Sequence, residues 1–222
     1  PGSTGSIDPE DYAEIGGLWE ALNRKKVSFY NFGEANETAH VREEWYDTNT
    51  GAAHGVMVPM QKALFKRTSH NYAGYNMNIP DQYRMDQFEK EFTDKWIKGK
   101  EKLPSLITMQ VPNDHGADIR PGDGYYYPHS YMVDNDLALG RILHFLSRTE
   151  YWENMLVIIT EDDPQGGVDH IDAHRSVLMM AGPYVKKGYV SHNHANFGSI
   201  LKTIYNILNV PYVNQFDVTA SL

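Results

Sequence analysis

The chain has 222 residues, of which 41% are hydrophobic, and it carries a formal net charge of -9 and no cysteine. This length and apolar content are enough for one α/β domain with its own core, so we treat residues 1–222 as a single domain. The negative charge argues against a nucleic-acid partner. The lack of cysteine excludes disulfides and thiolate metal ligands. No apolar run reaches the ~20 residues that a membrane span needs.

The N-terminal third combines a helix–strand pair with a long irregular region. Asp8 and Pro9 stand in the order typical of a helix start, and the predicted strand Val27–Gly33 follows that helix. A helix that leads into a strand is half of a βαβ unit, so we expect another strand upstream and interpret the chain as the C-terminal portion of a larger domain. Residues 34–80 are predicted to be an irregular, loop-rich region within it.

A second helix–strand pair ends in polar residues. Residues 81–98 place apolar side chains at helical spacing, and the apolar segment 105–112 is predicted to be a buried strand. Asn113, Asp114 and His115 follow directly. Open α/β sheets bind ligands at the carboxyl ends of their strands, so an acid and an imidazole are expected at that edge.

The loop over residues 116–130 leads into the next predicted helix. Arg120 and Tyr125 lie in this loop, which either lines a substrate entrance or is an ordinary loop packed by its aromatic residues. Asp134 is of a type that caps helices, and we expect the helix to start there and to end near Arg148.

The segment 155–176 is the centre of the predicted site. It begins as an apolar run typical of a strand buried on both faces of a parallel sheet, and it ends in Glu161, Asp162 and Asp163. Four more potential metal ligands follow within six positions: Asp169, His170, Asp172 and His174. Such groups repel one another or desolvate badly unless a cation lies among them, so the cluster predicts a divalent metal site. Each residue alone is equally well explained as a loop or capping residue.

The C-terminal part adds one strand and one helix to this pattern. Ser176–Ala181 is predicted to be another buried strand, and Asn196 to cap a final helix that ends before Pro211. Residues 215–220 are expected to form a peripheral tail.

Three motifs are long and ordered enough to indicate a family. Met109–His115, Asp134–Ile142 and Ile159–Ser176 together resemble the phosphoesterase branch of the alkaline phosphatase superfamily, which includes bacterial acid phosphatases and phospholipase C enzymes. The likeness continues at Gly182–Lys186 and at Gln215–Asp217. It implies a bacterial protein of the periplasm or the cell exterior, with a three-layer α/β/α sandwich around a mostly parallel sheet.

The resemblance also implies an activity and a ligand set. The expected activity is metal-dependent hydrolysis of small-molecule, lipid or sugar phosphate esters, with one or two divalent ions such as Zn, Mn or Ca. Asp162 and Asp163 match the acidic pair that binds one metal, and His174 matches the histidine that binds the other. His115, with Asp114 beside it, matches a further ligand after an earlier strand. His170 lies in the same segment as His174.

The nucleophile is the part of the family pattern that is missing. In the superfamily it is a Thr or Ser at a helix N-terminus, upstream of every motif matched here, so we expect it upstream of residue 1 and expect little or no turnover from this chain alone. A sulfatase, a phosphonate hydrolase or a phosphomutase of the same fold remains an alternative. A non-catalytic domain that binds a sugar or cell-envelope ligand is another.

Overall fold

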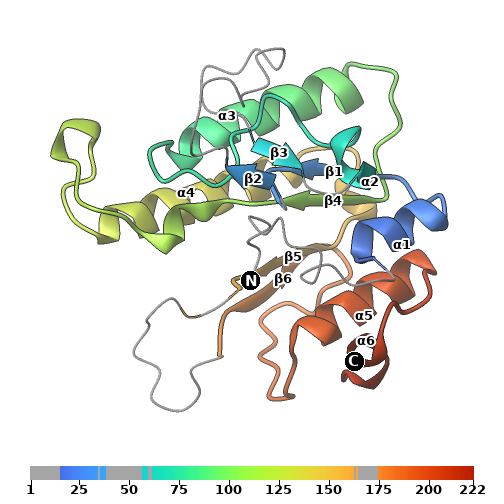
Figure 1. Ribbon diagram of the computed structural model, residues 1–222. Coiled ribbons are helices and arrows are strands. Elements are labelled where there is room, and N and C mark those ends of the chain that lie inside the picture. Colours follow the sequence, from blue (N-terminus) through green and yellow to red (C-terminus); the bar gives the residue numbers. More distant parts are fainter. Residues whose placement is uncertain (1–15, 35, 39–56, 60–61, 163, 165–174) are drawn as a thin grey trace.

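The structure, a computed structural model, describes residues 16–34, 36–38, 57–59, 62–162, 164 and 175–222 (Figure 1). Its helices are α1 (Leu18–Arg24), α2 (Lys62–Phe65), α3 (Asp81–Phe92), α4 (His129–Leu146), α5 (Phe197–Leu208) and α6 (Gln215–Thr219). Its strands are β1 (Phe29–Phe32), β2 (Asn36–Thr38), β3 (Met57–Pro59), β4 (Leu106–Met109), β5 (Val157–Thr160) and β6 (Leu178–Ala181). No helix among these residues is long and apolar enough to cross a membrane.

The parallel pair β1–β4 has helices and apolar side chains on both of its faces. Phe29 lies opposite Leu106 and Phe32 lies opposite Met109, which confirms both predicted strands. Successive side chains of a strand point to opposite faces, so Phe32 joins one apolar cluster while Phe29 joins another. This pair of strands is therefore buried on both sides.

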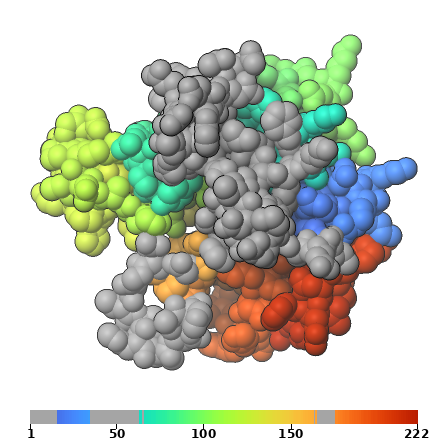
Figure 2. All heavy atoms as spheres, in the orientation of Figure 1, coloured from blue at the N-terminus to red at the C-terminus, as the bar shows by residue number. Residues whose placement is uncertain are grey.

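The two clusters divide the helices between them. The first joins β1, α3 and α4 through buried side chains: Phe32, Tyr72, Met85, Phe88, Phe92, Trp96, Ala138, Ile142 and Leu146. The second joins α1, β1, α2, α5 and the segment after α5: Ala21, Leu22, Phe29, Leu64, Tyr205, Val210 and Val213. In Figure 2 the blue residues of α1 accordingly lie against the red C-terminal part of the chain.

The helix predicted over residues 81–98 is confirmed, with a change of geometry near its end. α3 continues into a π-helical turn (Thr93–Ile97). In this turn Trp96 faces the core and is only 3% exposed. Its ring meets those of Phe92 and Tyr30 edge-on, with centroids 5.0 and 5.3 Å away. These contacts attach the end of the helix to β1.

The predicted start of α4 at Asp134 was wrong, because the helix begins five residues earlier, at His129. Asp134 lies in the second turn, and its Oδ2 accepts the Asp81 main-chain N–H at 2.7 Å. Pro80, which precedes α3, makes no side-chain cap. Asp134 thus caps the N-terminus of α3, 53 residues away, and not that of its own helix.

The pairing of β5 and β6 differs from the expectation. Both were expected to be buried strands of a mostly parallel sheet, but they pair antiparallel, with Val157 opposite Ala181. Three residues of β6 are 40–48% exposed: Leu178, Met179 and Met180. β2 and β3 also pair antiparallel. The described residues therefore form an α/β protein with two-stranded sheets, and the three-layer sandwich stays a prediction.

The C-terminal segment confirms one expectation and corrects another. Asn196 caps α5, since its Oδ1 accepts the Ser199 main-chain N–H at 3.0 Å. Residues 215–220, expected as a tail, include the short helix α6. Asp217 of that helix is 1% exposed and accepts the Val213 main-chain N–H at 3.0 Å. The end of the chain is therefore fixed to the second cluster.

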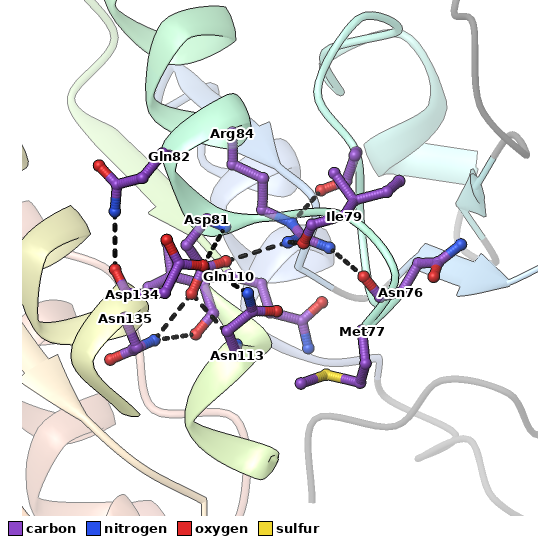
Figure 3. Close-up of polar contacts among 12 residues, drawn as sticks. Asn76, Met77, Ile79, Asp81, Gln82, Arg84, Gln110, Asn113, Asp134 and Asn135 are labelled. Atoms are coloured by element: carbon purple, nitrogen blue, oxygen red, sulfur yellow. Dashed lines mark hydrogen bonds and ion pairs between the residues drawn. The ribbon is translucent and has the colours of Figure 1, made fainter. Parts of the chain in front are cut away.

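A buried ion pair at the start of α3 connects several segments (Figure 3). Arg84 Nη1 lies 3.0 Å from Asp81 Oδ1, and both side chains are fully buried. Asp81 Oδ2 accepts from Asn113 N and from Asn135 Nδ2, both at 3.1 Å. Arg84 also donates to four main-chain carbonyls: Ala73 (2.8 Å), Gly74 (2.5 Å), Asn76 (2.9 Å) and Ile79 (2.6 Å).

We expect Asp81→Ala to lower the free energy of unfolding by about 3–5 kcal/mol, because it leaves the Arg84 guanidinium buried without a counter-charge. Asp86→Ala is a matched control on the same helix. Asp86 pairs with Arg141 at 2.7 Å, but its side chain is 66% exposed, so its loss should cost about 0–1 kcal/mol. Urea unfolding of both variants measures the difference, and equal losses would contradict the importance of the buried pair.

Candidate functional site

A 3₁₀ turn after β4 carries Asp114 and His115 (Pro112–His115). The turn is anchored from the protein interior by Asn113, which is fully buried. Asn113 Nδ2 donates to Asp134 Oδ2 at 2.6 Å, and its main-chain N–H donates to Asp81. The two residues after Asn113 are therefore presented by a fixed turn, with Asp114 half-buried and His115 exposed.

The end of β5 reaches the same region. Asp162, two residues after β5, is exposed. Burial raises the pKa of the Asp114 carboxyl, and the nearby charge of Asp162 raises it further. The main-chain N–H groups of Asp114 and His115 oppose this rise. Asp162, which follows β5, thus lies close enough to Asp114, which follows β4, for its charge to act on that carboxyl. The two strands pair in different two-stranded sheets, so the shared sheet edge stays a prediction.

Tyr75 lies beside this site, and no pattern in the sequence pointed to it. Its ring lies edge-on to the His115 imidazole, with centroids 5.5 Å apart and an interplanar angle of 85°. Burial raises the pKa of its phenol, and the charges of Asp114 and Asp162 add to the rise. Tyr75 lies in the region that we predicted only as irregular, where no periodic pattern singles out one residue.

The remaining predicted metal ligands lie outside the described residues: Asp163, His170 and His174. Asp169 and Asp172 lie there as well. Among the residues that the structure describes, no three His, Asp or Glu side chains are grouped closely enough to hold a metal ion. The ligand assignments therefore stay predictions.

The donor types at the site fit a hard or borderline divalent cation. Asp114 and Asp162 supply carboxylate oxygens, and His115 is adjacent in sequence to the more buried acid. His115 Nδ1 lies 3.2 Å from the Gly116 carbonyl oxygen, which leaves Nε2 as the nitrogen available to a ligand when Nδ1 carries the proton. Burial and the charge of Asp162 both raise the pKa of the Asp114 carboxyl, and a cation beside the two carboxylates would favour the ionised form.

Arg120 and Tyr125 have structural contacts in the loop after the 3₁₀ turn. Arg120 donates to the Tyr131 hydroxyl at 3.0 Å and to the Met77 carbonyl at 2.8 Å. Tyr125 is 5% exposed, stacks on Tyr131 with centroids 4.1 Å apart, and donates to Asp134 Oδ2 at 3.1 Å. These contacts match the alternative of a loop packed by its aromatic residues, and substrate binding by Arg120 and Tyr125 stays an untested prediction.

The proximity of Asp114 and Asp162 is testable by titration. We expect Asp162→Asn to lower the pKa of Asp114, because a negative charge that disfavours its ionisation is removed while its burial is unchanged. Asp136→Asn, an exposed site on α4, should leave that pKa as it is. Carboxyl ¹³C NMR in the presence of a chelator measures both, and an unchanged Asp114 pKa in Asp162→Asn would contradict the proximity.

The comparison with known families assigns the chain to a family. Residues 18–211 match the model of the Phosphoesterase family, a range that includes β1, β4, β5 and the candidate site. No match was found among curated proteins or among solved structures. Because the match covers most of the 222 residues, the chain belongs to the Phosphoesterase family.

Proposed function

We propose that the chain is the metal-binding part of a hydrolase of phosphoric esters, in the phosphoesterase branch of the alkaline phosphatase superfamily. The family match supports the reaction class. The observation that carries the proposal is the approach of Asp162 to Asp114. The charge of Asp162, which follows β5, adds to the rise that burial causes in the pKa of the Asp114 carboxyl, which follows β4. That arrangement suits a cation at the carboxyl edge of the strands.

Asp114, Asp162 and His115 are the described residues that we propose as ligands. Because the described residues contain no group of three such side chains close enough to hold an ion, further ligands would be needed. Asp163, His170 and His174 are proposed as the other ligands on sequence grounds. A bound divalent ion would supply positive charge for the phosphoryl oxygens and lower the pKa of the nucleophile. Zn accepts both the carboxylate and the imidazole donors, whereas Mn and Ca favour the carboxylate oxygens.

The residues of this chain would do two things besides binding metal. The 3₁₀ turn Pro112–His115, fixed through Asn113, would hold Asp114 and His115 in one orientation. The chain's net charge of -9 would repel a phosphate ester everywhere except near bound cations, which would direct the substrate to the site. We propose a small-molecule, lipid or sugar phosphate ester as the substrate and a periplasmic or extracellular location in a bacterium.

Metal binding is the first test. We expect the chain, dialysed against Zn, Mn or Ca and then against buffer, to retain one or two ions per molecule by elemental analysis. Asp162→Asn should weaken that binding by at least about tenfold, because even indirect partners of a metal contribute that much and Asp162 is proposed as a direct ligand. Asp136→Asn should bind as the unmodified chain does. Failure of the unmodified chain to bind any of the three metals would overturn the proposal.

Hydrolysis distinguishes the alternatives within the fold. The metal-loaded chain is assayed with an aryl phosphate and with the matching aryl sulfate. Phosphate hydrolysis that disappears in Asp162→Asn would support the proposal and would place the nucleophile within these 222 residues. Metal binding without turnover would fit a nucleophile outside them. Hydrolysis of the sulfate alone would indicate a sulfatase instead.

A further inference from the structure

The segment that carries Tyr75 is fixed although it lies outside any helix or strand. Arg84 donates to the carbonyls of Gly74 and Asn76, the two neighbours of Tyr75, and also to that of Ala73. On the other side, the Tyr72 hydroxyl donates to the Gln110 carbonyl at 2.6 Å, next to the end of β4. Tyr75 thus lies on a third segment, and hydrogen bonds hold the backbone on both sides of it.

The position of the Tyr75 ring distinguishes it from the core tyrosines. Tyr72 and Tyr131 are at most 4% exposed. Tyr75 is only half-buried, and its ring lies against the imidazole of His115. Its phenol is close enough to Asp114 and Asp162 to be affected by both charges. It therefore faces the candidate site and not the core.

The phenol of Tyr75 is a hydrogen-bond donor, which the two carboxylates of the site are not. Ionised carboxylates accept hydrogen bonds and cannot donate them, so Asp114 and Asp162 have nothing to offer a phosphoryl oxygen directly. A phenol has an ordinary pKa of about 10 and carries its proton at neutral pH, so it can donate to an anionic oxygen. Hydrogen bonds with a charged acceptor are roughly twice as strong as neutral ones.

We propose that Tyr75 is a substrate-binding residue, which donates its phenol hydrogen to a non-bridging oxygen of the phosphoryl group. The inference rests on the proposed function, because the phosphoryl group is placed beside Asp114 and Asp162 by the metal they hold. Arg84 is then a positioning residue that acts through the backbone around Tyr75. No covalent step is assigned to the phenol.

The test uses Tyr75→Phe, which removes the hydroxyl and keeps the ring that contacts His115. The probe is phenylphosphonate, which mimics a phosphate monoester and is not hydrolysed, titrated into the Mn-loaded chain by calorimetry. We expect its dissociation constant to rise about tenfold in Tyr75→Phe, with manganese stoichiometry and thermal unfolding unchanged. Tyr126→Phe, at a tyrosine that is 60% exposed, is the matched control and should bind phenylphosphonate as the unmodified chain does.

The outcomes separate this inference from the function on which it rests. Unchanged phenylphosphonate affinity in Tyr75→Phe, or no phenylphosphonate binding by the metal-loaded unmodified chain, would overturn the role of Tyr75 and leave the metal site standing. Loss of manganese from Tyr75→Phe would also overturn it, since the phenol would then act on the metal. An unmodified chain that binds no metal would remove the proposed function and this inference together.

Discussion

The buried ion pair between Asp81 and Arg84 is the interaction on which the rest of the structure depends. Burying two charges costs several kcal/mol for each ion, and their attraction offsets this cost only when their remaining donors and acceptors are also hydrogen-bonded. Arg84 meets this condition, since its five N–H groups reach Asp81 and four main-chain carbonyls of residues 73–79. Lys could not replace it, because an ammonium has three donors at one point and no planar fork.

The same pair determines where the site residues lie. Asp81 fixes the 3₁₀ turn of Asp114 through the main-chain N–H of Asn113, and Arg84 fixes the segment of Tyr75. Burial raises the pKa of Asp81 to about 6 against the opposing effect of Arg84, so the carboxyl is ionised at neutral pH. The pair of Asp81 and Arg84 therefore holds two segments of the candidate site, the turn of Asp114 and the segment of Tyr75. Among the described site residues, only Asp162 comes from a separate strand, β5.

Local patterns explain why much of the fold is readable from the sequence. β1, β4, α3 and the Asn196 cap each follow from periodicity or from a polar side chain beside its own helix. Asp134 was misread because its partner, the Asp81 N–H, is remote in sequence. A cap motif indicates that a side chain can cap a helix, but not which helix it caps.

The candidate site was also predictable only in part. Asp114 and Asp162 were expected together because polar residues after strands meet at a sheet edge. The charge of Asp162 does add to the rise that burial causes in the pKa of Asp114, although β4 and β5 pair in different two-stranded sheets. Tyr75 had no such signal, since its place depends on the carbonyl bonds of Arg84. Tyr125 was singled out by residue type in a loop, whereas its hydroxyl is bonded to Asp134 inside the protein. Residue type predicts chemistry well and orientation poorly.

The exposed face of β6 has a consequence for the behaviour of the protein in solution. Four consecutive apolar residues, Val177–Met180, are 40–48% exposed, and β6 pairs with no described strand other than β5. An apolar strand with an unpaired edge can pair through its backbone with a strand of another copy of the chain. At neutral pH the net charge of -9 keeps the copies apart. Acidification removes that repulsion as carboxylates and histidines take up protons, so colloidal stability should be lowest in mildly acidic buffer.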